Sequence, residues 1–322
     1  MPNAHHCLTP DHIDYDVIIV GAGMAGISAA LWCKRLQLSF CWFDDKHQSG
    51  GQLRRLHNGI PDYPGRIYRN GIELADALDE QLVTLNLKPR LQEAVTHFDL
   101  TNRCVATHQG RYRARAIVLG TGVSNRRLGL SDEDRLWGRG VSDSASRDRK
   151  HFVDQVVAVV GGGDAACENA LMLAQQCPKV YLLARGTLRA RPDFQAAVTE
   201  DPRITVLRHH QVTALHGEQK LERLTVQGPE GPKILTVTGL FIRIGVNPNS
   251  TPFASQVLSD AQGYVSVDAN QQSSLPNVYA IGDVASATHS SLAHAAGSGM
   301  VAIKSIQRTL DRSRHETMDS QS

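Results

Sequence analysis

The stretch that decides the fold is Tyr15–Asp45, which reads YDVIIVGAGMAGISAALWCKRLQLSFCWFDD. Its first part, Val17–Val20, is a run of β-branched residues, the composition of a buried parallel strand. A glycine-rich turn follows, and then a helical pattern over Met24–Leu36. A second strand, Ser39–Phe43, ends in two acids. The stretch therefore predicts a strand, a tight turn, a helix and a second strand, the unit from which doubly wound sheets are built.

The glycines of this turn are spaced as Gly-x-Gly-x-x-Gly, and each position has its own steric reason. Gly21 permits the sharp turn, Gly23 leaves no Cβ between the backbone and a pyrophosphate, and Gly26 lets the helix lie close on the strand. The pyrophosphate would lie at the helix N-terminus, where free N–H groups favour an anion. Asp44 follows about 20 residues on, where an acid hydrogen-bonds a ribose hydroxyl. A dinucleotide site is therefore favoured over a turn that only packs the helix on the strand.

Length and composition indicate an ordinary globular protein. The chain has 322 residues, enough for about two domains, with 41% hydrophobic and 20% charged residues. The formal net charge of +2, without a basic block, gives no support for nucleic-acid binding. No apolar run reaches the roughly 18 residues of a membrane span, and the N-terminus lacks the apolar core of a signal peptide. We therefore expect a cytoplasmic protein that binds neither membranes nor nucleic acid.

The six cysteines are scattered, at positions 7, 33, 41, 104, 167 and 177. None forms Cys-x-x-Cys and none has the spacing of zinc ligands, so we predict no metal site. Four of them fall within helix or strand patterns, which favours small buried side chains in a reducing compartment. Residues 1–14 also carry histidines, but we expect this segment to be a flexible leader rather than a metal site.

A second dinucleotide signature follows in the middle of the chain. The strand Val156–Val160 leads into a Gly-x-Gly-x-x-Ala turn, then a helix through Gln176 and a further strand, Val180–Leu183. Two such units in one chain indicate two nucleotides. The residues predicted to contact the second nucleotide at this turn are Gly161, Gly163, Asp164 and Ala165.

The second unit ends differently from the first. Its second strand is followed by Arg185 and Arg189, with no acid at the position where the first unit has Asp44. Arginines at this point suit the 2′-phosphate of NADP, whereas an acid suits NAD. We therefore predict that Arg185 and Arg189 contact that phosphate. The alternative is that both are solvated surface arginines.

Further glycines mark places where the backbone can approach a cofactor. Gly51 and Gln52 follow the first nucleotide-binding strand pair, and Gln52 offers an amide to a polar ring edge. Gly122 follows another apolar strand. Gly282 and Asp283 end the strand of residues 278–281, and a carboxylate there can bind a ribityl hydroxyl.

The remaining elements are predicted from periodicity. Leu87–Ala106 and Arg111–Leu119 alternate like two antiparallel strands. A helix is predicted over Leu292–Leu310, and residues 312–322 are expected to form a flexible tail.

Taken together, these landmarks resemble the low-molecular-weight thioredoxin reductases and their relatives among flavoproteins with two dinucleotide folds. The matching residues run nearly end to end: Gly21–Gly26, Gly50–Leu53, Tyr63–Gly65, Gly120–Gly122, Trp137–Ser142, Val157–Ala166, Val180–Arg189, Gly245–Asn249 and Gly282–Val284. In that family the first glycine motif holds FAD, the second holds NADPH, and the proteins are homodimers.

The resemblance implies an α/β fold of two Rossmann-like dinucleotide-binding domains, each of three ββα layers. It implies an FAD domain made of residues 15–121 and 244–311, with an NAD(P)H domain, residues 122–243, inserted into it. FAD would be held by Gly21, Gly23, Gly26, Asp44, Gly51, Gln52, Gly122, Gly282 and Asp283. NADPH would be held by Gly161, Gly163, Asp164, Ala165, Arg185 and Arg189.

One departure from the family pattern matters most. The family has Cys-Ala-Thr-Cys-Asp before the second glycine motif, and ungapped counting places Ser144 and Arg147 at the two cysteine positions. Neither residue can cycle through a disulfide, and the family's acid, Asp148, is retained without a thiolate to serve. We therefore expect no thioredoxin reduction by the family's dithiol route.

Smaller departures affect both cofactor sites. The family's His-Arg-Arg is Ala184-Arg185-Gly186 here, so one arginine is lost. His294 falls one helical turn from the expected flavin edge. It is a candidate proton donor to reduced flavin, with a hydrogen-bonded structural histidine as the alternative.

The function predicted from these residues is an FAD-dependent NAD(P)H oxidoreductase that passes electrons directly at the flavin to an external acceptor. The candidate acceptors are a small redox protein such as ferredoxin or flavodoxin, a quinone, and a small disulfide. One alternative is a flavin-binding sensor or interaction protein without turnover. Another is a ferredoxin-linked flavoenzyme that does not use nicotinamide.

Overall fold

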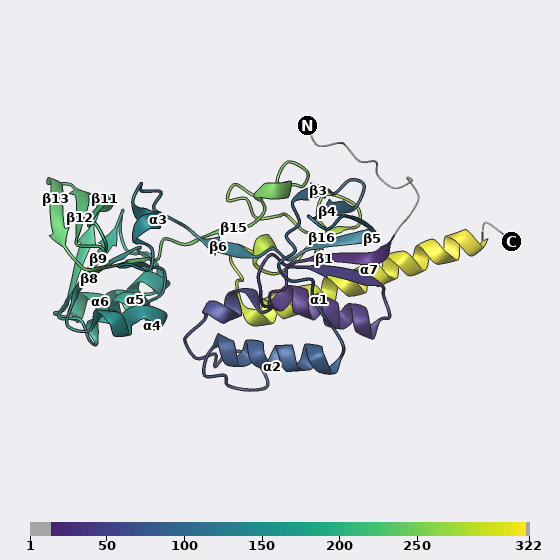
Figure 1. Cartoon of the computed structure of the whole chain (residues 1–322), viewed down its shortest axis with the longest axis horizontal. Helices are drawn as coiled ribbons and strands as arrows, with labels where there is room; N and C mark the ends of the chain where they lie inside the picture. The colour runs from purple at the N-terminus through teal and green to yellow at the C-terminus, as the bar shows by residue number, and fades with distance from the viewer. Residues whose placement is uncertain (1–13, 320–322) are drawn as a thin grey trace. The chain divides into compact units, whose positions relative to one another are not determined.

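The structure, a computed structural model, describes residues 14–319, which divide into two compact units. The first, here called the split unit, runs to Ser124 and resumes at Pro248. The second, the inserted unit, is Asn125–Asn247 and carries the labels β8, β9, β11 to β13 and α3 to α6 in Figure 1. The chain passes between them along two short strands that pair with each other, β6 (Val123–Asn125) and β15 (Val246–Pro248).

The split unit has three layers, with parallel strands in the middle. Strand β1 lies between β2 and β5, and β16 pairs with the other edge of β5. The beginning of β5 continues into an antiparallel meander with β4 and β3. The strands are β1 (Tyr15–Val20), β2 (Phe40–Phe43), β3 (His97–Asp99), β4 (Cys104–Ala106), β5 (Arg111–Leu119) and β16 (Val278–Ala280).

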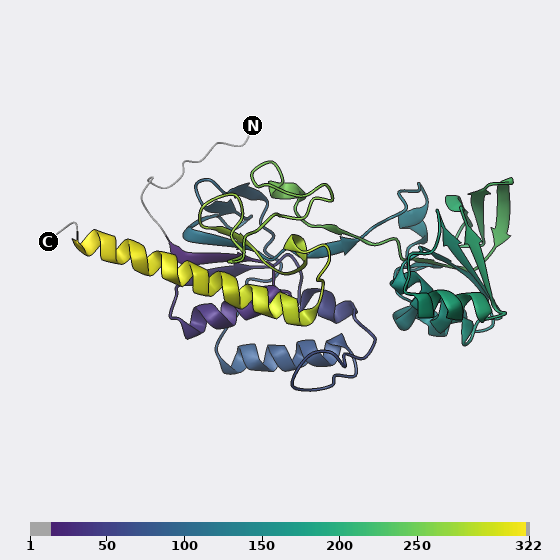
Figure 2. The same ribbon diagram turned by 180° about the vertical axis from the view of Figure 1, so that it is seen from behind.

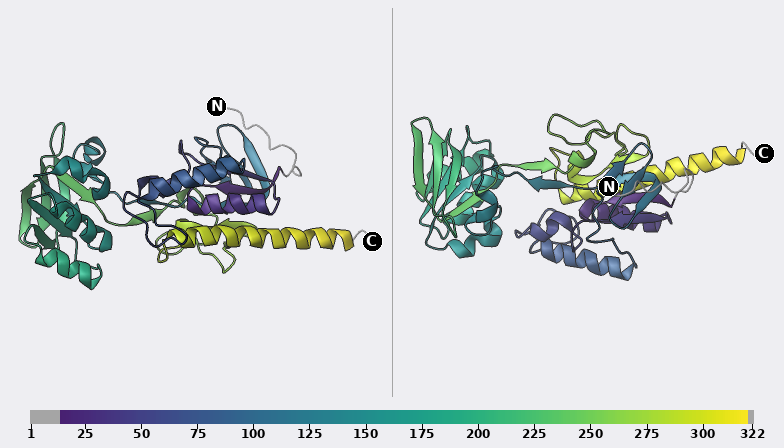
Figure 3. Two further views of the ribbon diagram at one scale, coloured as in Figure 1. Left: turned by 90° about the horizontal axis from the view of Figure 1, so that it is seen from below. Right: turned by 45° about the horizontal axis from the view of Figure 1, so that its top comes forward.

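Three helices cover one face of these parallel strands, and the meander lies on the other side (Figures 1 and 2). The helices are α1 (Met24–Arg35), α2 (Gly71–Thr84) and α7 (Leu292–Asp319). Helices α1 and α7 run side by side, as the left view of Figure 3 shows. Short 3-10 turns complete the unit: η1 (Gly51–Arg55), η3 (Thr251–Phe253) and η4 (Gly282–Ala285).

The core of the split unit follows from the alternation of side chains along β1. Val17 and Ile19 face the helices, whereas Ile18 and Val20 face the opposite layer. All four are buried, because β1 has a neighbour on each edge and a layer on each face. Full burial of one such side chain stabilises the fold by about 2 kcal/mol.

The inserted unit repeats this plan. Its parallel sheet has the order β10-β9-β8-β14-β7, with an antiparallel meander of β11, β12 and β13. The strands are β7 (Val141–Ser142), β8 (Val156–Val160), β9 (Lys179–Ala184), β10 (Ile204–Arg208), β11 (Gln211–His216), β12 (Arg223–Gly228), β13 (Gly231–Thr236) and β14 (Gly239–Ile242). The helices are α3 (Glu133–Leu136), α4 (Ala145–Asp148), α5 (Asp164–Ala174) and α6 (Pro192–Glu200), with a 3-10 turn η2 (Arg149–Phe152).

This arrangement confirms the predicted fold class of two Rossmann-like units, one inserted into the other. The prediction of an antiparallel strand over Leu87–Ala106 is confirmed for β4, which pairs with β5, but is wrong in its extent, since residues 87–96 form no strand. The strands β3 and β4 are separate, because the chain turns between them with Arg103 in the left-handed region at φ 53°. Helix α7 continues to Asp319, past its predicted end at Leu310, because residues 311–319 contain neither glycine nor proline. No helix within residues 14–319 is long and apolar enough to span a membrane.

Candidate functional site

The first glycine turn, between β1 and α1, has a distinct environment at each glycine. Gly21 has φ +110°, and a Cβ on it would lie 2.2 Å from the Gly120 carbonyl oxygen. A Cβ on Gly26 would lie 1.9 Å from the Gly21 oxygen, so the start of α1 is pressed against the end of β1. A Cβ on Gly23 would meet no atom within 4 Å. This open position fits a pyrophosphate at the N-terminus of α1.

Asp44, which follows β2, is fixed beside this turn. Its carboxylate accepts hydrogen bonds from the backbone N–H of Ala22 at 2.5 Å and of Lys46 at 2.8 Å. Burial raises the pKa of Asp44, and these two donors oppose that effect. Each carboxylate oxygen retains a further lone pair that can accept a ribose hydroxyl.

Four predicted FAD contacts from distant parts of the sequence lie near this turn. Gly51 begins η1 with φ +53°, and a Cβ on it would lie 3.0 Å from the Gly23 Cα. The next residue, Gln52, donates from its amide to the carboxylate of Asp283 at 2.8 Å. The backbone N–H of Gly282 donates to the Ser298 hydroxyl at 2.9 Å. Helix α7 therefore holds the Gly282-Asp283 turn near the glycine motif.

Helices α1 and α7 approach closely because small residues meet between them. A Cβ on Gly299 would lie 2.4 Å from the Ala25 oxygen, and the Ser28 hydroxyl donates to the Ala296 oxygen at 2.6 Å. His294 is half-buried in the first turn of α7, and its ring lies 6.3 Å from that of His289. Its backbone N–H donates to the Ser291 hydroxyl, which caps the helix. This contact involves only the backbone of His294. It does not test the role predicted for the His294 ring, which stays a prediction.

Gly122 lies where β5 leads into β6. It has φ +65°, and a Cβ on it would meet nothing within 4 Å. Its carbonyl oxygen accepts from the backbone N–H of Asn249 at 2.9 Å. Open space at Gly122 is compatible with the close approach of a ligand, as the sequence predicts.

The second glycine turn, between β8 and α5, repeats the first. Gly161 has φ +146°, and a Cβ on it would lie 2.1 Å from the Arg243 oxygen, whereas Gly163 again faces open space. Asp164 accepts from the backbone N–H of Arg191 at 2.7 Å and pairs with its guanidinium at 3.3 Å. Ala165 follows in the first turn of α5. The open position at Gly163 fits a second pyrophosphate.

Arg185 and Arg189 follow β9, as predicted, and both are exposed. Within residues 14–319 neither side chain forms an ion pair or hydrogen bond. The backbone N–H of Arg189 donates to the Gly162 oxygen at 2.6 Å, which ties this segment to the glycine turn. Arg189 is therefore tied through its backbone to the second glycine turn, and the guanidinium donors of both arginines have no protein partner among the described residues.

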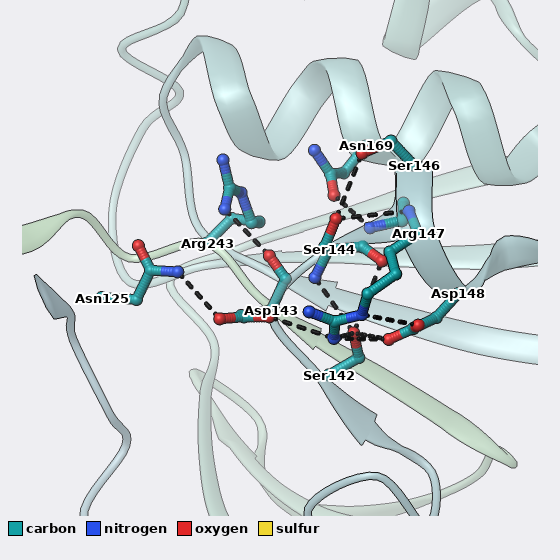
Figure 4. Close-up of polar contacts among 10 residues, drawn as sticks. Asn125, Ser142, Asp143, Ser144, Ser146, Arg147, Asp148, Asn169 and Arg243 are labelled. Atoms are coloured by element: carbon teal, nitrogen blue, oxygen red, sulfur yellow. Dashed lines mark hydrogen bonds and ion pairs between the residues drawn. The ribbon is translucent and has the colours of Figure 1, made fainter. Parts of the chain in front are cut away.

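The segment Ser142–Asp148, where the sequence comparison predicts the positions of the family dithiol, is held by a dense polar network (Figure 4). Ser144 is the N-cap of α4, and its hydroxyl accepts from the backbone N–H of Arg147 at 3.3 Å. The backbone N–H of Ala145 donates to the Asn169 amide oxygen at 2.9 Å, which fastens α4 to α5. Ser144 therefore has a structural role at the start of a helix.

Arg147 lies between two carboxylates. It donates two hydrogen bonds to Asp148, at 2.8 and 2.7 Å, and its guanidinium lies 3.2 Å from a carboxylate oxygen of Asp143. The Ser142 hydroxyl also donates to Asp148, at 2.5 Å. Burial alone would raise the pKa of Asp148, but the bonds from Arg147 and Ser142 outweigh it and hold the pKa below its usual range. The hydrogen bond to Asp148 raises the pKa of Arg147.

The sequence did not identify the residues that support this network from outside the segment. Asn125 donates from its amide to Asp143 at 2.9 Å, and Arg243 donates to the Asp143 carbonyl oxygen at 2.9 Å. Asp143 itself is buried, with 3% of its side chain exposed. These partners lie up to 100 residues apart along the chain, and no local pattern marks them.

The thiols of the described residues are free and mostly inaccessible. Burial raises the pKa of Cys33, Cys41 and Cys167, and raises that of Cys177 to about 11. Cys177 also donates to the Phe152 oxygen at 3.2 Å. Residues 14–319 contain no group of three or more histidine, cysteine or acidic side chains placed to hold a metal ion. Cys7 and the N-terminal histidines lie outside the described residues.

Comparison with known proteins gives matches along almost the whole chain. A model of the pyridine nucleotide-disulphide oxidoreductase family matches residues 15–299. The thioredoxin reductase of Streptomyces clavuligerus is 35% identical over 304 residues, covering 92% of this chain and 94% of that protein. That of Streptomyces coelicolor is 36% identical over 294 residues, covering 88% and 90%. The crystal structure of Lactococcus lactis thioredoxin reductase in its FR conformation superposes with a TM-score of 0.80 at 25% identity, covering 92% of this chain and 98% of that one.

Proposed function

The chain belongs to the pyridine nucleotide-disulphide oxidoreductase family, and on that premise we propose that it is an FAD-dependent NAD(P)H oxidoreductase without an internal dithiol. The thioredoxin reductases of this family use FAD and NADPH. When bound, FAD would supply the redox chemistry, which is hydride transfer from the nicotinamide followed by electron transfer to an external acceptor. The split unit would hold FAD and the inserted unit NADPH, each at its own glycine turn.

The observation that carries the proposal is the Arg147 network. Ser144 and Arg147 stand at the positions of the family dithiol, and both are committed to hydrogen bonds within α4 and its neighbours. The chain contains no Cys-x-x-Cys. The described cysteines are single, and burial suppresses the thiolate form in four of the five. Electrons would therefore leave the protein from the flavin itself.

Several residues would position the FAD. Asp44 would accept a ribose hydroxyl, and Asp283, oriented by Gln52, would accept a ribityl hydroxyl. His294, in the first turn of α7, would be the proton donor to reduced flavin. The close approach of α1 and α7 would keep the two ligand-facing helix N-termini together.

The acceptor would be a small redox protein of the ferredoxin or flavodoxin type, a quinone, or a small disulfide. The relatives are named thioredoxin reductases, but we do not expect this chain to reduce thioredoxin by their dithiol route. The proposed assembly is a homodimer.

The test is anaerobic reduction of the purified flavoprotein by NADPH or NADH. Rapid bleaching of the flavin band by either nucleotide is the expected result. Bleaching by reduced ferredoxin alone would replace the proposal by the ferredoxin-linked enzyme. A protein that no donor bleaches would be a flavin-binding sensor or interaction module, and the oxidoreductase assignment would be abandoned.

A second experiment addresses the missing dithiol directly. We expect the wild-type protein to show no NADPH-dependent reduction of thioredoxin. The double variant Ser144→Cys/Arg147→Cys restores a Cys-x-x-Cys at the start of α4. The variant should gain a disulfide that NADPH reduces, detected by thiol titration. Thioredoxin reduction by the wild type at a rate typical of its relatives would refute the dithiol-free mechanism.

A further inference from the structure

The parallel sheet of the inserted unit brings a third arginine to the edge that carries Arg185 and Arg189. Strands β8, β9 and β10 are parallel and adjacent, so their carboxyl ends lie at one edge. Strand β10 ends at Arg208, which pairs in register with Ala184, the residue before Arg185. Adjacent strands lie about 4.8 Å apart, which is within reach of an arginine side chain. Arg208 is exposed, as Arg185 and Arg189 are.

The backbone that follows Arg208 is fixed against this edge. His209 has φ 59°, a left-handed conformation that turns the chain sharply. The backbone N–H of His210 then donates to the Ala184 oxygen at 2.9 Å. The His210 ring lies 2.6 Å from the Arg208 oxygen and fills the space over Gly228, where a Cβ would lie 2.4 Å from it. Arg208 is therefore held beside the end of β9 and is not on a free loop.

These three arginines combine a place at the ends of β9 and β10 with the absence of a carboxylate partner in the described part of the chain. Five other arginines of the inserted unit, namely Arg127, Arg135, Arg147, Arg191 and Arg203, pair with carboxylates. Within residues 14–319, the side chains of Arg185, Arg189 and Arg208 form no ion pair. Asp164, the acid at the start of α5, is already paired with Arg191. Three guanidinium groups without ion-pair partners among the described residues, on adjacent strand ends beside a dinucleotide turn, are suited to a phosphate monoester.

We propose that Arg208 binds the 2′-phosphate of NADPH together with Arg185 and Arg189, and so favours NADPH over NADH. The inference rests on the proposed function, because it assumes that the second glycine turn holds a nicotinamide dinucleotide. Residue 186, between the two arginines of the β9 segment, is glycine and supplies no side chain. Arg208, at the end of the neighbouring strand β10, would supply the third cation that the segment after β9 lacks.

The test uses binding of 2′,5′-ADP and 5′-AMP to the full-length protein, measured by isothermal titration calorimetry. These probes share the adenosine and 5′-phosphate and differ in the 2′-phosphate. The variant Arg208→Gln should weaken binding of 2′,5′-ADP about tenfold and leave that of 5′-AMP unchanged. Arg223→Gln is the matched control, because Arg223 is exposed and lies at the other end of β12 from Gly228. It should change neither affinity.

Two results with the Arg208→Gln variant would overturn the assignment of Arg208. One is an unchanged affinity of Arg208→Gln for 2′,5′-ADP, and the other is an equal loss for both probes. A wild-type protein that binds neither probe would overturn it as well. Circular dichroism of both variants confirms that each is folded. The measurement does not involve the flavin, so a protein that binds 2′,5′-ADP through Arg208 but is not bleached by NADPH would refute the proposed redox function alone.

Discussion

Arg147→Ala should destabilise the inserted unit, because it removes the cation between two carboxylates. Arg147 donates two hydrogen bonds to Asp148, at 2.8 and 2.7 Å, and lies 3.2 Å from Asp143. A hydrogen bond to a charged group contributes about 1.5–3 kcal/mol when it is shielded from water. Here 36% of the Arg147 side chain and 20% of that of Asp148 are exposed, which reduces each contact to below about 1 kcal/mol.

The larger part of the cost comes from Asp143, which is 3% exposed and loses its ion-pair partner while retaining the hydrogen bond from Asn125. Adding these terms, we expect a loss of about 2 kcal/mol in the free energy of unfolding. In urea this corresponds to a midpoint lower by roughly 1 M.

The loss should depend on pH in a defined direction. The pKa of Asp148 is lower in the folded protein than its ordinary value, because the bonds from Arg147 and Ser142 outweigh burial. A carboxyl group of this kind stabilises the fold above its unfolded pKa of about 3.9, and that contribution is lost as pH falls through the folded pKa. The difference between Arg147→Ala and wild type should therefore be greatest at neutral pH and shrink towards about pH 3.

The assay is urea unfolding followed by circular dichroism at a series of pH values, with Lys150→Ala as the control. Lys150 is an exposed cation three residues from Arg147, and its removal should shift the midpoint little. A double-mutant cycle with Asp148→Asn should give a coupling energy of about 1 kcal/mol. The reasoning fails if Arg147→Ala is no less stable than Lys150→Ala, or if its deficit is the same at every pH.

Three further substitutions or treatments separate the roles of individual residues. Gly23→Ala should fold normally but purify with little flavin, because its Cβ enters open space at the pyrophosphate position. Gly26→Ala should instead lower the soluble yield, because its Cβ would lie 1.9 Å from a backbone oxygen. Equal flavin content and equal soluble yield in the two variants would contradict this reasoning. Replacing both Arg185 and Arg189 by alanine should raise KM for NADPH about tenfold or more and change that for NADH little, and steady-state kinetics showing equal losses would remove their assignment. Iodoacetamide should label Cys177 slowly in the native protein at about pH 8, since its pKa is about 11; labelling as fast as in urea would show that the thiol is reactive.

The sequence determined the elements whose cause is local. The glycine spacing at positions 21–26 and 161–166 fixed two strand–turn–helix units, because the steric demand of each turn is met within a few residues. It also determined which side chains follow the strands, and so placed Asp44, Arg185 and Arg189 at the sheet edges. The sequence did not predict the break between β3 and β4, because the alternation of apolar and polar residues continues through the turn at which Arg103 is left-handed.

Only the tertiary structure decided which distant residues meet. Gln52 and Asp283 are 231 residues apart and share a hydrogen bond, and Arg243 reaches Asp143 across 100 residues. The sequence identified Ser144 and Arg147 only as residues without a thiol at the predicted dithiol positions. The structure shows what they do instead, since one caps α4 and the other is held between two carboxylates. Such contacts depend on how sheets and helices pack, and periodicity along the chain carries no information about side chains that approach from another element.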